Sequence, residues 1–537
     1  MARQARCNAP WYELNISAPD NRVTACCFYA GQTDVVSDDY QDIDGYWNSP
    51  AMVDLRKIQS GDSSVDASGC RQCFYFKYRG DSGDSYISDF QNPPEDLSDA
   101  QRANWQAAID AFKAGDSHVA STPLRYYFNF GFACNISCIM CHQVPRRKTN
   151  KRQLAADLFL KWKPSMVSAR EIWVIGGEPL LLPEAVKFID SVLVDPDLAD
   201  VQLVIYTNGT LIERHLDRLR KKRKLQLIVS LDAVGSAYEY IRHRGKWDTV
   251  ERGILKFKEA GARHGLNWSV LTANIVMKSS IPALGALVDW SIKHDITPSF
   301  MDFINAEGLE LNFRQESVTT YPELLDEIPG WRDEFSGAIG KLKARGWVSA
   351  AGVLSNILET LATKYDANSI KRSELARIRS QGAWSSVYAG NSSQLYSLLQ
   401  VNHYGKMRGQ KPLVLKEDGM VWSPTDGKDH LATPYFKASR KDVSGTRWIR
   451  ILSEWPADSE PDACLLTVQD TQFNTLPIAG SYRTANGQVT TETCLELPEK
   501  ATGFRLVWTP AALGTTLVPR TVRVEQCIEA RAEIVNA

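Results

Sequence analysis

The chain has 537 residues, enough for several domains, and 44% of them are hydrophobic, which suffices for more than one buried core. Its 62 lysines and arginines nearly balance 63 aspartates and glutamates, so no overall field favours nucleic acid or an anionic membrane as a partner. The first residues lack the apolar segment of a secretory signal, and no apolar run could span a bilayer. We therefore expect a soluble, cytoplasmic protein.

A β-hairpin is expected close to the N-terminus. Residues 11–16 alternate apolar and polar side chains, a Pro-Asp-Asn turn follows, and residues 22–25 return in the opposite direction. A helix-like segment at 52–60 comes next, and residues 94–114 read as a linking helix with Asp96 or Ser98 as its cap.

Cysteines are concentrated in this half of the chain: of eleven, eight fall within the first 141 residues. One cysteine precedes the expected hairpin, and an adjacent pair of cysteines directly follows it. Two more form a C-x2-C pair after the helix-like segment. These thiols are Cys7, Cys26, Cys27, Cys70 and Cys73. Four thiolates of this kind suit an iron–sulfur cluster or a structural zinc ion.

A second cysteine group, Cys134, Cys138 and Cys141, has the spacing C-x3-C-x2-C. Three thiolates in one loop can hold three irons of a [4Fe–4S] cluster. No fourth cysteine follows at a comparable spacing, so one iron is left open to bind a substrate or cofactor directly. Taken alone, the spacing would also suit a zinc half-site.

Buried strands alternate with helical segments after these cysteines, which predicts parallel α/β units. The strands are expected near 172–176, 201–207, 227–231 and 273–277, and the helices near 183–193, 211–223 and 249–265. In such folds, ligand-binding groups gather where the parallel strands end. The candidates there are Gly176, Gly177, Glu178, Pro179, Thr207, Asn208, Ser230, Arg242 and Asn274.

In this order and spacing, the elements resemble the radical S-adenosylmethionine (SAM) superfamily. The resemblance implies a partial (β/α)6 barrel over residues 121–310 and a SAM-binding [4Fe–4S] cluster on the three cysteines. It also implies that the Gly-Gly-Glu-Pro turn holds the amino group of SAM, while Ser230 and Arg242 grip its carboxylate. Met140 stands where an aromatic residue is common in the family, and it packs either on the adenine or in the core.

The N-terminal thiols resemble the SPASM/twitch auxiliary domain of radical SAM enzymes. This resemblance implies a second [4Fe–4S] cluster held by Cys7, Cys70, Cys73 and one of Cys26 or Cys27, of which we prefer Cys27. A structural zinc site is the alternative. The domain usually follows the barrel, whereas here it precedes it.

The last third of the sequence changes character twice. Helical periodicity covers residues 311–407, including 321–346, 354–365, 370–380 and 395–404, and short alternating strands follow. The expected fold class is α/β: the partial barrel, a small N-terminal α+β cluster-binding domain and a C-terminal all-β sandwich. The expected domains are 1–92 (auxiliary), 93–120 (linking helix), 121–310 (barrel), 311–407 (helical) and 408–537 (sandwich). Trp422, Trp448, Trp455 and Trp508 could stack on sugars, although core packing is the preferred interpretation.

The resemblance implies that an electron from a flavodoxin- or ferredoxin-type donor cleaves SAM to a 5'-deoxyadenosyl radical, which removes hydrogen from a C–H bond. The leading substrate is a carbohydrate-like or other small molecule, oxidised or epimerised with help from the auxiliary cluster. A peptide- or protein-modifying maturase is the alternative, and a non-catalytic iron–sulfur scaffold is a third hypothesis. Asp302, at the end of a late barrel strand, is the candidate base over the barrel mouth, with a strand-end cap as the alternative.

Overall fold

The computed structural model describes residues 7–527 with gaps, the longest at 71–87, 304–315, 403–412 and 438–446. The described chain divides into two compact units. The first comprises residues 1–302 and 333–355, and the second comprises 303–332 and 356–537. No helix among the described residues is long and apolar enough to cross a membrane.

An eight-stranded sheet in the order β2-β1-β3-β4-β5-β6-β7-β8 forms the centre of the first unit. Strands β3 to β8 are parallel throughout, as expected for a partial barrel. Val174, Leu203 and Leu227 are fully buried, which explains the apolar residues in the central part of these strands. The strands are β1 (Glu13–Ser17), β2 (Arg22–Thr24), β3 (Arg125–Asn129), β4 (Glu171–Ile175), β5 (Gln202–Thr207), β6 (Lys224–Ser230), β7 (Asn267–Val276) and β8 (Thr297–Asp302).

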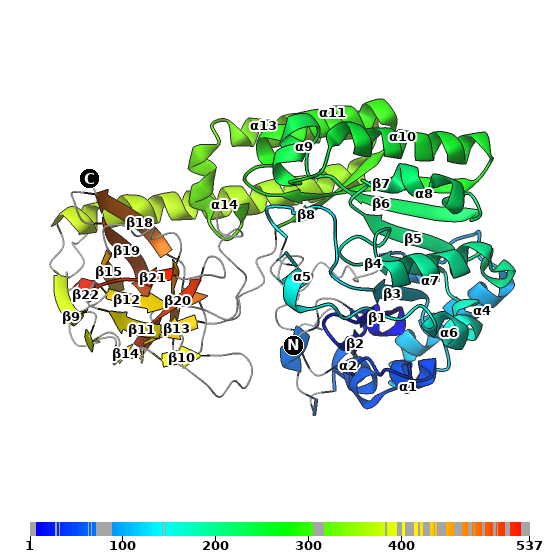
Figure 1. Cartoon of the computed structure of the whole chain (residues 1–537), viewed down its shortest axis with the longest axis horizontal. Coiled ribbons are helices and arrows are strands. Elements are labelled where there is room, and N and C mark those ends of the chain that lie inside the picture. Colours follow the sequence, from blue (N-terminus) through cyan, green and yellow to red (C-terminus); the bar gives the residue numbers. More distant parts are fainter. Residues whose placement is uncertain are drawn as a thin grey trace. The chain divides into compact units, whose positions relative to one another are not determined.

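Helices alternate with the parallel strands and cover the outer face of the sheet (Figure 1). The expected helices are confirmed to within a few residues, because their apolar positions recur at helical spacing. They are α7 (Pro183–Val194), α8 (Ile212–Leu219) and α10 (Trp247–Arg263). Three further helices were not expected: α6 (Leu158–Met166), α9 (Gly235–Ile241) and α11 (Leu284–His294). Short helices precede them: α1 (Ile43–Trp47), α2 (Pro50–Ser60) and α5 (Arg146–Thr149).

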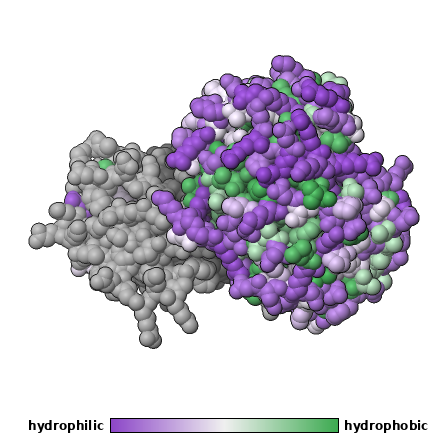
Figure 2. Space-filling model, turned by 45° about the vertical axis from the view of Figure 1, so that its right-hand side comes forward, coloured by the Kyte–Doolittle hydropathy of each residue, from purple (hydrophilic) through white to green (hydrophobic). Residues whose placement is uncertain are grey.

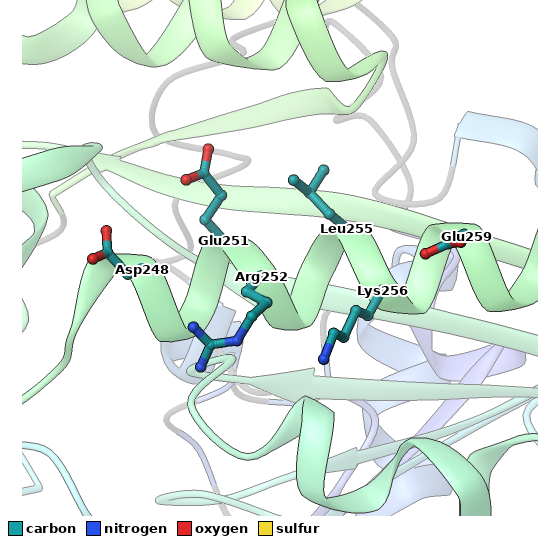
Figure 3. A pocket seen from close by; sticks show the side chains of 6 residues that line it. All are labelled: Asp248, Glu251, Arg252, Leu255, Lys256 and Glu259. Atoms are coloured by element: carbon teal, nitrogen blue, oxygen red, sulfur yellow. The ribbon is translucent and has the colours of Figure 1, made fainter.

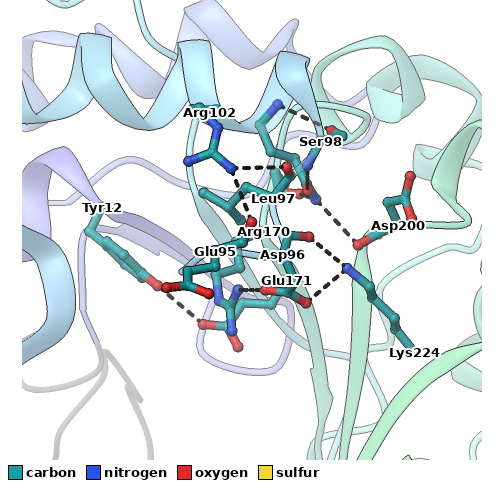
Figure 4. A network of polar contacts seen from close by, with 12 residues as sticks. Tyr12, Glu95, Asp96, Leu97, Ser98, Arg102, Arg170, Glu171, Asp200 and Lys224 are labelled. Carbon is teal, nitrogen blue, oxygen red and sulfur yellow. Dashed lines mark hydrogen bonds and ion pairs between the residues drawn. The ribbon is translucent and has the colours of Figure 1, made fainter. Parts of the chain in front are cut away.

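The linking helix is α4 (Asp99–Ala114), and its start was predictable. Ser98 caps it and forms a reciprocal capping box with Gln101, while Gly115 ends it in a left-handed conformation. Asp96 is not the cap. Its carboxylate lies 3.0 Å from Nζ of Lys224 at the start of β6, so the segment before α4 contacts the N-terminal edge of the barrel sheet (Figure 4).

The N-terminal hairpin differs from what the sequence suggested. β1 and β2 are antiparallel as expected, but β1 also pairs in parallel with β3 and therefore extends the barrel sheet. Glu13, Arg125 and Glu171 stand side by side in register at the starts of β1, β3 and β4. Arg125 pairs with Glu13 at 3.0 Å and with Glu171 at 2.6 Å, which fixes the hairpin to the barrel.

In the helical segment, the prediction was partly wrong. The helix expected at 321–346 is a short 3-10 helix, Pro322–Glu327, followed by α13 (Trp331–Arg345). The next two expected helices are one continuous helix, α14 (Val348–Gln381). No proline interrupts residues 348–381, so nothing forces a break. The expected helix at 395–404 is contradicted where the chain is described, because Gln400–Asn402 form strand β10.

Antiparallel strands make up the rest of the second unit, and they begin at Trp384, before the expected boundary at 408. The two larger sheets share one core, to which Ile449, Ile451, Phe504 and Leu506 contribute, so they form a sandwich. Trp448, Trp455 and Trp508 are buried, as the core interpretation predicted. The strands are β9 (Trp384–Asn391), β10, β11 (Leu413–Lys416), β12 (Gly419–Trp422), β13 (His430–Ala432), β14 (Phe436–Lys437), β15 (Arg447–Trp455), β16 (Cys464–Asp470), β17 (Thr475–Leu476), β18 (Ile478–Ala485), β19 (Val489–Leu497), β20 (Gly503–Pro510), β21 (Thr516–Val518) and β22 (Thr521–Cys527).

Candidate functional site

Cys134, Cys138 and Cys141 lie in the loop after β3, at the C-terminal edge of the parallel strands. The loop backbone rests on the glycine turn after β4. The amide of Gly177 donates to the carbonyl of Gly131 at 2.7 Å, and the next amide donates to Ala133 at 2.9 Å. A Cβ on Gly177 would stand 2.3 Å from the carbonyl oxygen of Ala133. The glycine is therefore needed for contact with the cysteine loop, whereas the sequence had suggested close approach to a ligand.

Each of the three thiols receives one N–H donor from a different side chain. Nδ2 of Asn208 lies 3.5 Å from Sγ of Cys134, and Nη1 of Arg242 lies 3.6 Å from Sγ of Cys138. Nη2 of Arg147 lies 3.5 Å from Sγ of Cys141. Donors of this kind stabilise negative charge on sulfur.

Burial, in contrast, disfavours negative charge on two of the thiols, Cys134 and Cys138. It raises the pKa of Cys134, and it raises the pKa of Cys138 to about 11 although Arg242 lowers it. The metal-free thiols are thus protonated at neutral pH. Thiolate formation would accompany metal binding, as is usual for cysteine ligands.

Glu178 is fully buried and joins the ends of two strands. Its carboxylate accepts hydrogen bonds from the Thr207 hydroxyl and the Asn208 amide, both at 2.8 Å, and from the Leu180 amide at 3.1 Å. Burial raises the pKa of Glu178 to about 7, and these hydrogen bonds oppose the rise. The carboxylate therefore holds the Gly-Gly-Glu-Pro turn against the Thr-Asn-Gly turn after β5.

Arg242 is brought to the cysteine loop by backbone pairing. The amides of Ser137 and Ile139 donate to the carbonyls of His243 and Ile241, at 2.9 and 3.0 Å. Nη2 of Arg242 also pairs with Asp232 at 2.6 Å, and both side chains are almost completely buried. Sequence reasoning did not single out Asp232.

Three buried N–H or O–H groups around the cysteine loop lack a hydrogen-bond partner among the described residues: Nε of Arg242, Nε of Arg147 and the hydroxyl of Tyr238. Ser230 lies nearby, within hydrogen-bonding reach of Tyr206, whose pKa burial raises to about 12. Arg242 lowers the pKa of both tyrosines, so these groups lie close together. Unpartnered buried donors beside three thiols fit a carboxylate-bearing ligand at the open iron.

The remaining predicted cofactor residues have mixed placements. Thr207 and Asn208 are buried beside Glu178, Pro179 belongs to the same turn, and Met140 is buried within the cysteine loop. Asn274 is engaged differently: its amide donates to Thr272 and to the Ser299 carbonyl, and its oxygen accepts the Asp232 amide. This network braces the strand ends and leaves little hydrogen-bonding capacity for a cofactor.

Asp302 requires a correction. Along β8 the odd positions, Thr297, Ser299 and Met301, are exposed, whereas Phe300 and Asp302 are buried. Ser299 stands opposite Ala273, which lines the barrel interior with Tyr206. Because side chains alternate along a strand, Asp302 lies on the other face, toward the helices, and not over the barrel mouth.

The N-terminal cysteines are only partly described. Cys27 and Cys73 lie outside the described residues, whereas Cys7, Cys26 and Cys70 are partly buried. The buried side chain of Gln59 accepts the Cys7 amide at 3.0 Å and donates to Sγ of Cys70 at 3.4 Å. One glutamine of α2 thus brings together two cysteines that lie far apart in the sequence.

Among the described residues, no three His, Cys, Asp or Glu side chains converge on a single-ion site. Cluster thiolates each bind a different iron, so they need not converge in this way. The donor set that fits the open-iron cluster is the trio of thiols with its three N–H donors.

Comparison with known protein families identifies the domain that the sequence resemblance had suggested. Residues 128–277 match the radical SAM superfamily. This stretch of the chain is a radical SAM domain. It begins within β3, ends just after β7, and includes the cysteine loop and the glycine turn.

Curated relatives match about a third of the chain. A "Probable GTP 3',8-cyclase" of Methanococcus maripaludis (strain C6) is 29% identical over 178 residues, 32% of this chain and 57% of the relative. An "Fe-coproporphyrin III synthase" of Methanosarcina barkeri is 26% identical over 169 residues, 30% of this chain and 40% of the relative. The chain therefore spans 57% of the length of the first relative and 40% of the second.

Solved structures show weaker likeness. Streptococcus suis SuiB bound to precursor peptide SuiA has a TM-score of 0.31 and 15% identity, covering 55% of this chain and 65% of that one. Native anSMEcpe with bound AdoMet and Cp18Cys peptide has a TM-score of 0.26 and 15% identity, covering 39% and 59%. TM-scores this low carry no functional information.

A hollow elsewhere on the first unit lacks the features of the cysteine site. A shallow hollow of about 490 Å³ lies along α10, and five of its six lining residues are charged (Figure 3). It contains no cysteine and no strand end. On the face of the first unit that Figure 2 shows, hydrophilic residues predominate and hydrophobic residues gather in patches between them.

Sequence reasoning missed Arg147, Asp232 and Gln59. Arg147 lies in a basic run, residues 145–152, whose composition does not distinguish it from a solvated loop. Asp232 directly follows an expected strand and has a positive φ of 65°, which is rare outside glycine and asparagine-like residues. An aspartate at a strand end was the available signal for it. No local pattern identified Gln59.

Proposed function

We propose that this protein is a radical SAM enzyme in which Cys134, Cys138 and Cys141 hold a [4Fe–4S] cluster with one open iron. The observation that carries the proposal is the trio of thiols, each with its own N–H donor, beside unpartnered buried donors. When bound, the cluster supplies the electron that cleaves SAM to a 5'-deoxyadenosyl radical, which abstracts hydrogen from the substrate.

The chain's own residues have distinct tasks in this proposal. The glycine turn and Glu178 hold the cysteine loop in place and present backbone carbonyls to the SAM amino group. Ser230 and Arg242, whose Nε has no hydrogen-bond partner in the part of the chain that the structure describes, receive the SAM carboxylate. Asp232 keeps Arg242 ionised and aimed at the site through their 2.6 Å pair.

Formation of 5'-deoxyadenosine tests the proposal. The reconstituted, anaerobically reduced protein should release it from SAM, and Cys138→Ala should abolish release because the cluster loses a ligand. Cys494→Ala, which removes a buried thiol from the second unit, should retain it. A wild-type protein that assembles a cluster but releases no 5'-deoxyadenosine would be the scaffold of our third hypothesis.

We further propose a second [4Fe–4S] cluster held by Cys7, Cys27, Cys70 and Cys73. The Gln59 bridge between the Cys7 amide and the Cys70 thiol supports a shared site. The wild-type protein should bind about eight irons per chain, and Cys70→Ala about four, as expected for two four-iron clusters. Comparing the iron content of Cys26→Ala with that of Cys27→Ala identifies the fourth ligand of this cluster.

For the substrate, we propose a carbohydrate-containing small molecule that is oxidised or epimerised. Support comes from the relatives named as probable GTP 3',8-cyclases, because GTP contains a ribose. Assays pair the enzyme with sugar nucleotides specifically deuterated at each ribose carbon, with a flavodoxin or ferredoxin as donor. Deuterium in 5'-deoxyadenosine identifies the attacked carbon, whereas transfer only from a deuterated peptide would favour the maturase alternative.

A further inference from the structure

Arg147 contacts the cysteine loop at two points. Its Nη1 donates to the carbonyl of Ile136 at 2.5 Å, and its Nη2 lies 3.5 Å from Sγ of Cys141. The guanidinium thus spans the loop from its first turn to its last cysteine.

The three donors to the thiols differ in charge. Asn208 is neutral, and the charge of Arg242 is balanced by Asp232 at 2.6 Å. Within the described part of the chain, no carboxylate lies at ion-pair distance from Arg147. Arg147 is therefore the donor that brings an unbalanced positive charge to a cluster ligand.

Contacts with the N-terminal hairpin hold Arg147 in position. It belongs to α5, a four-residue helix with no buried side chain, so packing does not fix its place. Arg146 pairs with Asp20 at 2.8 Å, and Nδ2 of Asn150 donates to the Pro19 carbonyl at 2.7 Å. The hairpin turn thereby anchors both ends of α5.

We propose that Arg147 sets the reduction potential of the SAM-binding cluster, and that the hairpin turn positions it. The inference rests on the proposed function, since it needs the cluster. Reduction adds one negative charge to the cluster, and a nearby cation or N–H donor stabilises the reduced form more than the oxidised form. Loss of Arg147 therefore makes the cluster harder to reduce.

The experiment is an EPR-monitored redox titration of the reconstituted full chain without SAM. Arg147→Gln should lower the equilibrium constant for one-electron reduction by about tenfold, which corresponds to a potential about 59 mV lower. Lys148→Gln is the matched control, because it removes the same charge from an exposed neighbour and should leave the potential unchanged. Equal shifts in both variants, or no shift in Arg147→Gln, would overturn the proposal.

Two further variants test the proposal where the first pair of variants gives no answer. If Arg147→Gln assembles no cluster, Arg147→Lys takes its place, because it keeps the charge but loses the two-point fork that holds this charge beside Cys141. A potential below wild type then supports the proposal, whereas wild-type potentials in both Arg147→Lys and Asp20→Asn overturn it. Asp20→Asn should lower the potential by less than Arg147→Gln, and an unchanged potential there overturns the positioning by the hairpin. A wild-type protein that assembles no cluster overturns the proposed function as well, whereas an unmoved cluster potential overturns this inference alone.

Discussion

Asp232 and Arg242 form a buried ion pair, with 2.6 Å between Oδ2 and Nη2, at the C-terminal end of the barrel strands. The other carboxylate oxygen accepts the Ile275 amide at 2.8 Å, and Nη1 of Arg242 reaches Cys138. Asp232 thus joins β7 to the cysteine loop through one arginine.

Asp232→Asn should destabilise the metal-free protein by about 3 kcal/mol, because Arg242 would remain buried without its counter-charge. Urea unfolding under reducing conditions measures this, with Asp217→Asn as the control. Asp217 is 90% exposed and pairs with Arg220, so its substitution should cost less than about 0.5 kcal/mol. Equal costs in the two variants would contradict a structural role for the buried pair.

Gly177→Ala should displace the cysteine loop, because its Cβ would stand 2.3 Å from carbonyl oxygens of Phe132 and Ala133. We expect lower iron content after reconstitution and a loss of about 1–3 kcal/mol of stability. Gly337→Ala in α13 is the control, since nothing lies within 4 Å of its added Cβ. That variant should keep its iron and gain about 0.5 kcal/mol.

Glu178 predicts a pH dependence of stability. Burial raises its pKa to about 7 from an ordinary 4.5, so the folded protein binds this proton more tightly than the unfolded chain. The contribution is fully present below about pH 4.5 and is lost as the pH rises toward 7, a change of about 3 kcal/mol. The stability of wild type relative to Glu178→Gln should therefore fall between pH 5 and 8.

A matched exposed variant, Glu259→Gln on α10, should show no such trend between pH 5 and 8 against wild type, since its side chain is 62% exposed. If the difference in the free energy of unfolding between wild type and Glu178→Gln stays constant over this pH range, the buried carboxylate does not titrate there.

Arg125→Met should detach the hairpin from the barrel. It leaves the carboxylates of Glu13 and Glu171, which are 3% and 8% exposed, without their shared cation, and the cost should be about 3–5 kcal/mol. Proteolysis after residue 25 should also accelerate. Arg263→Gln, in an exposed i,i+4 pair, should cost less than about 0.5 kcal/mol and leave proteolysis unchanged.

Local sequence patterns were enough to predict much of the barrel. The strands before Gly176 and Thr207 are apolar runs, the helices between them have apolar positions at helical spacing, and Ser98 caps α4 with a capping box. Each of these features depends on neighbours within a few residues. The same locality misled the interpretation of residues 348–381, where a change in apolar pattern did not break the helix.

The sequence by itself determined the three cysteines and their spacing, the glycine turn, and the alternation of strands and helices, because each is written in adjacent residues. Only the tertiary structure decided that β1 joins β3, that Arg147, Asn208 and Arg242 each reach a different thiol, and that Asp302 faces the helices. Those outcomes depend on contacts between segments up to about a hundred residues apart, for which burial and register, and not local propensity, select the partner.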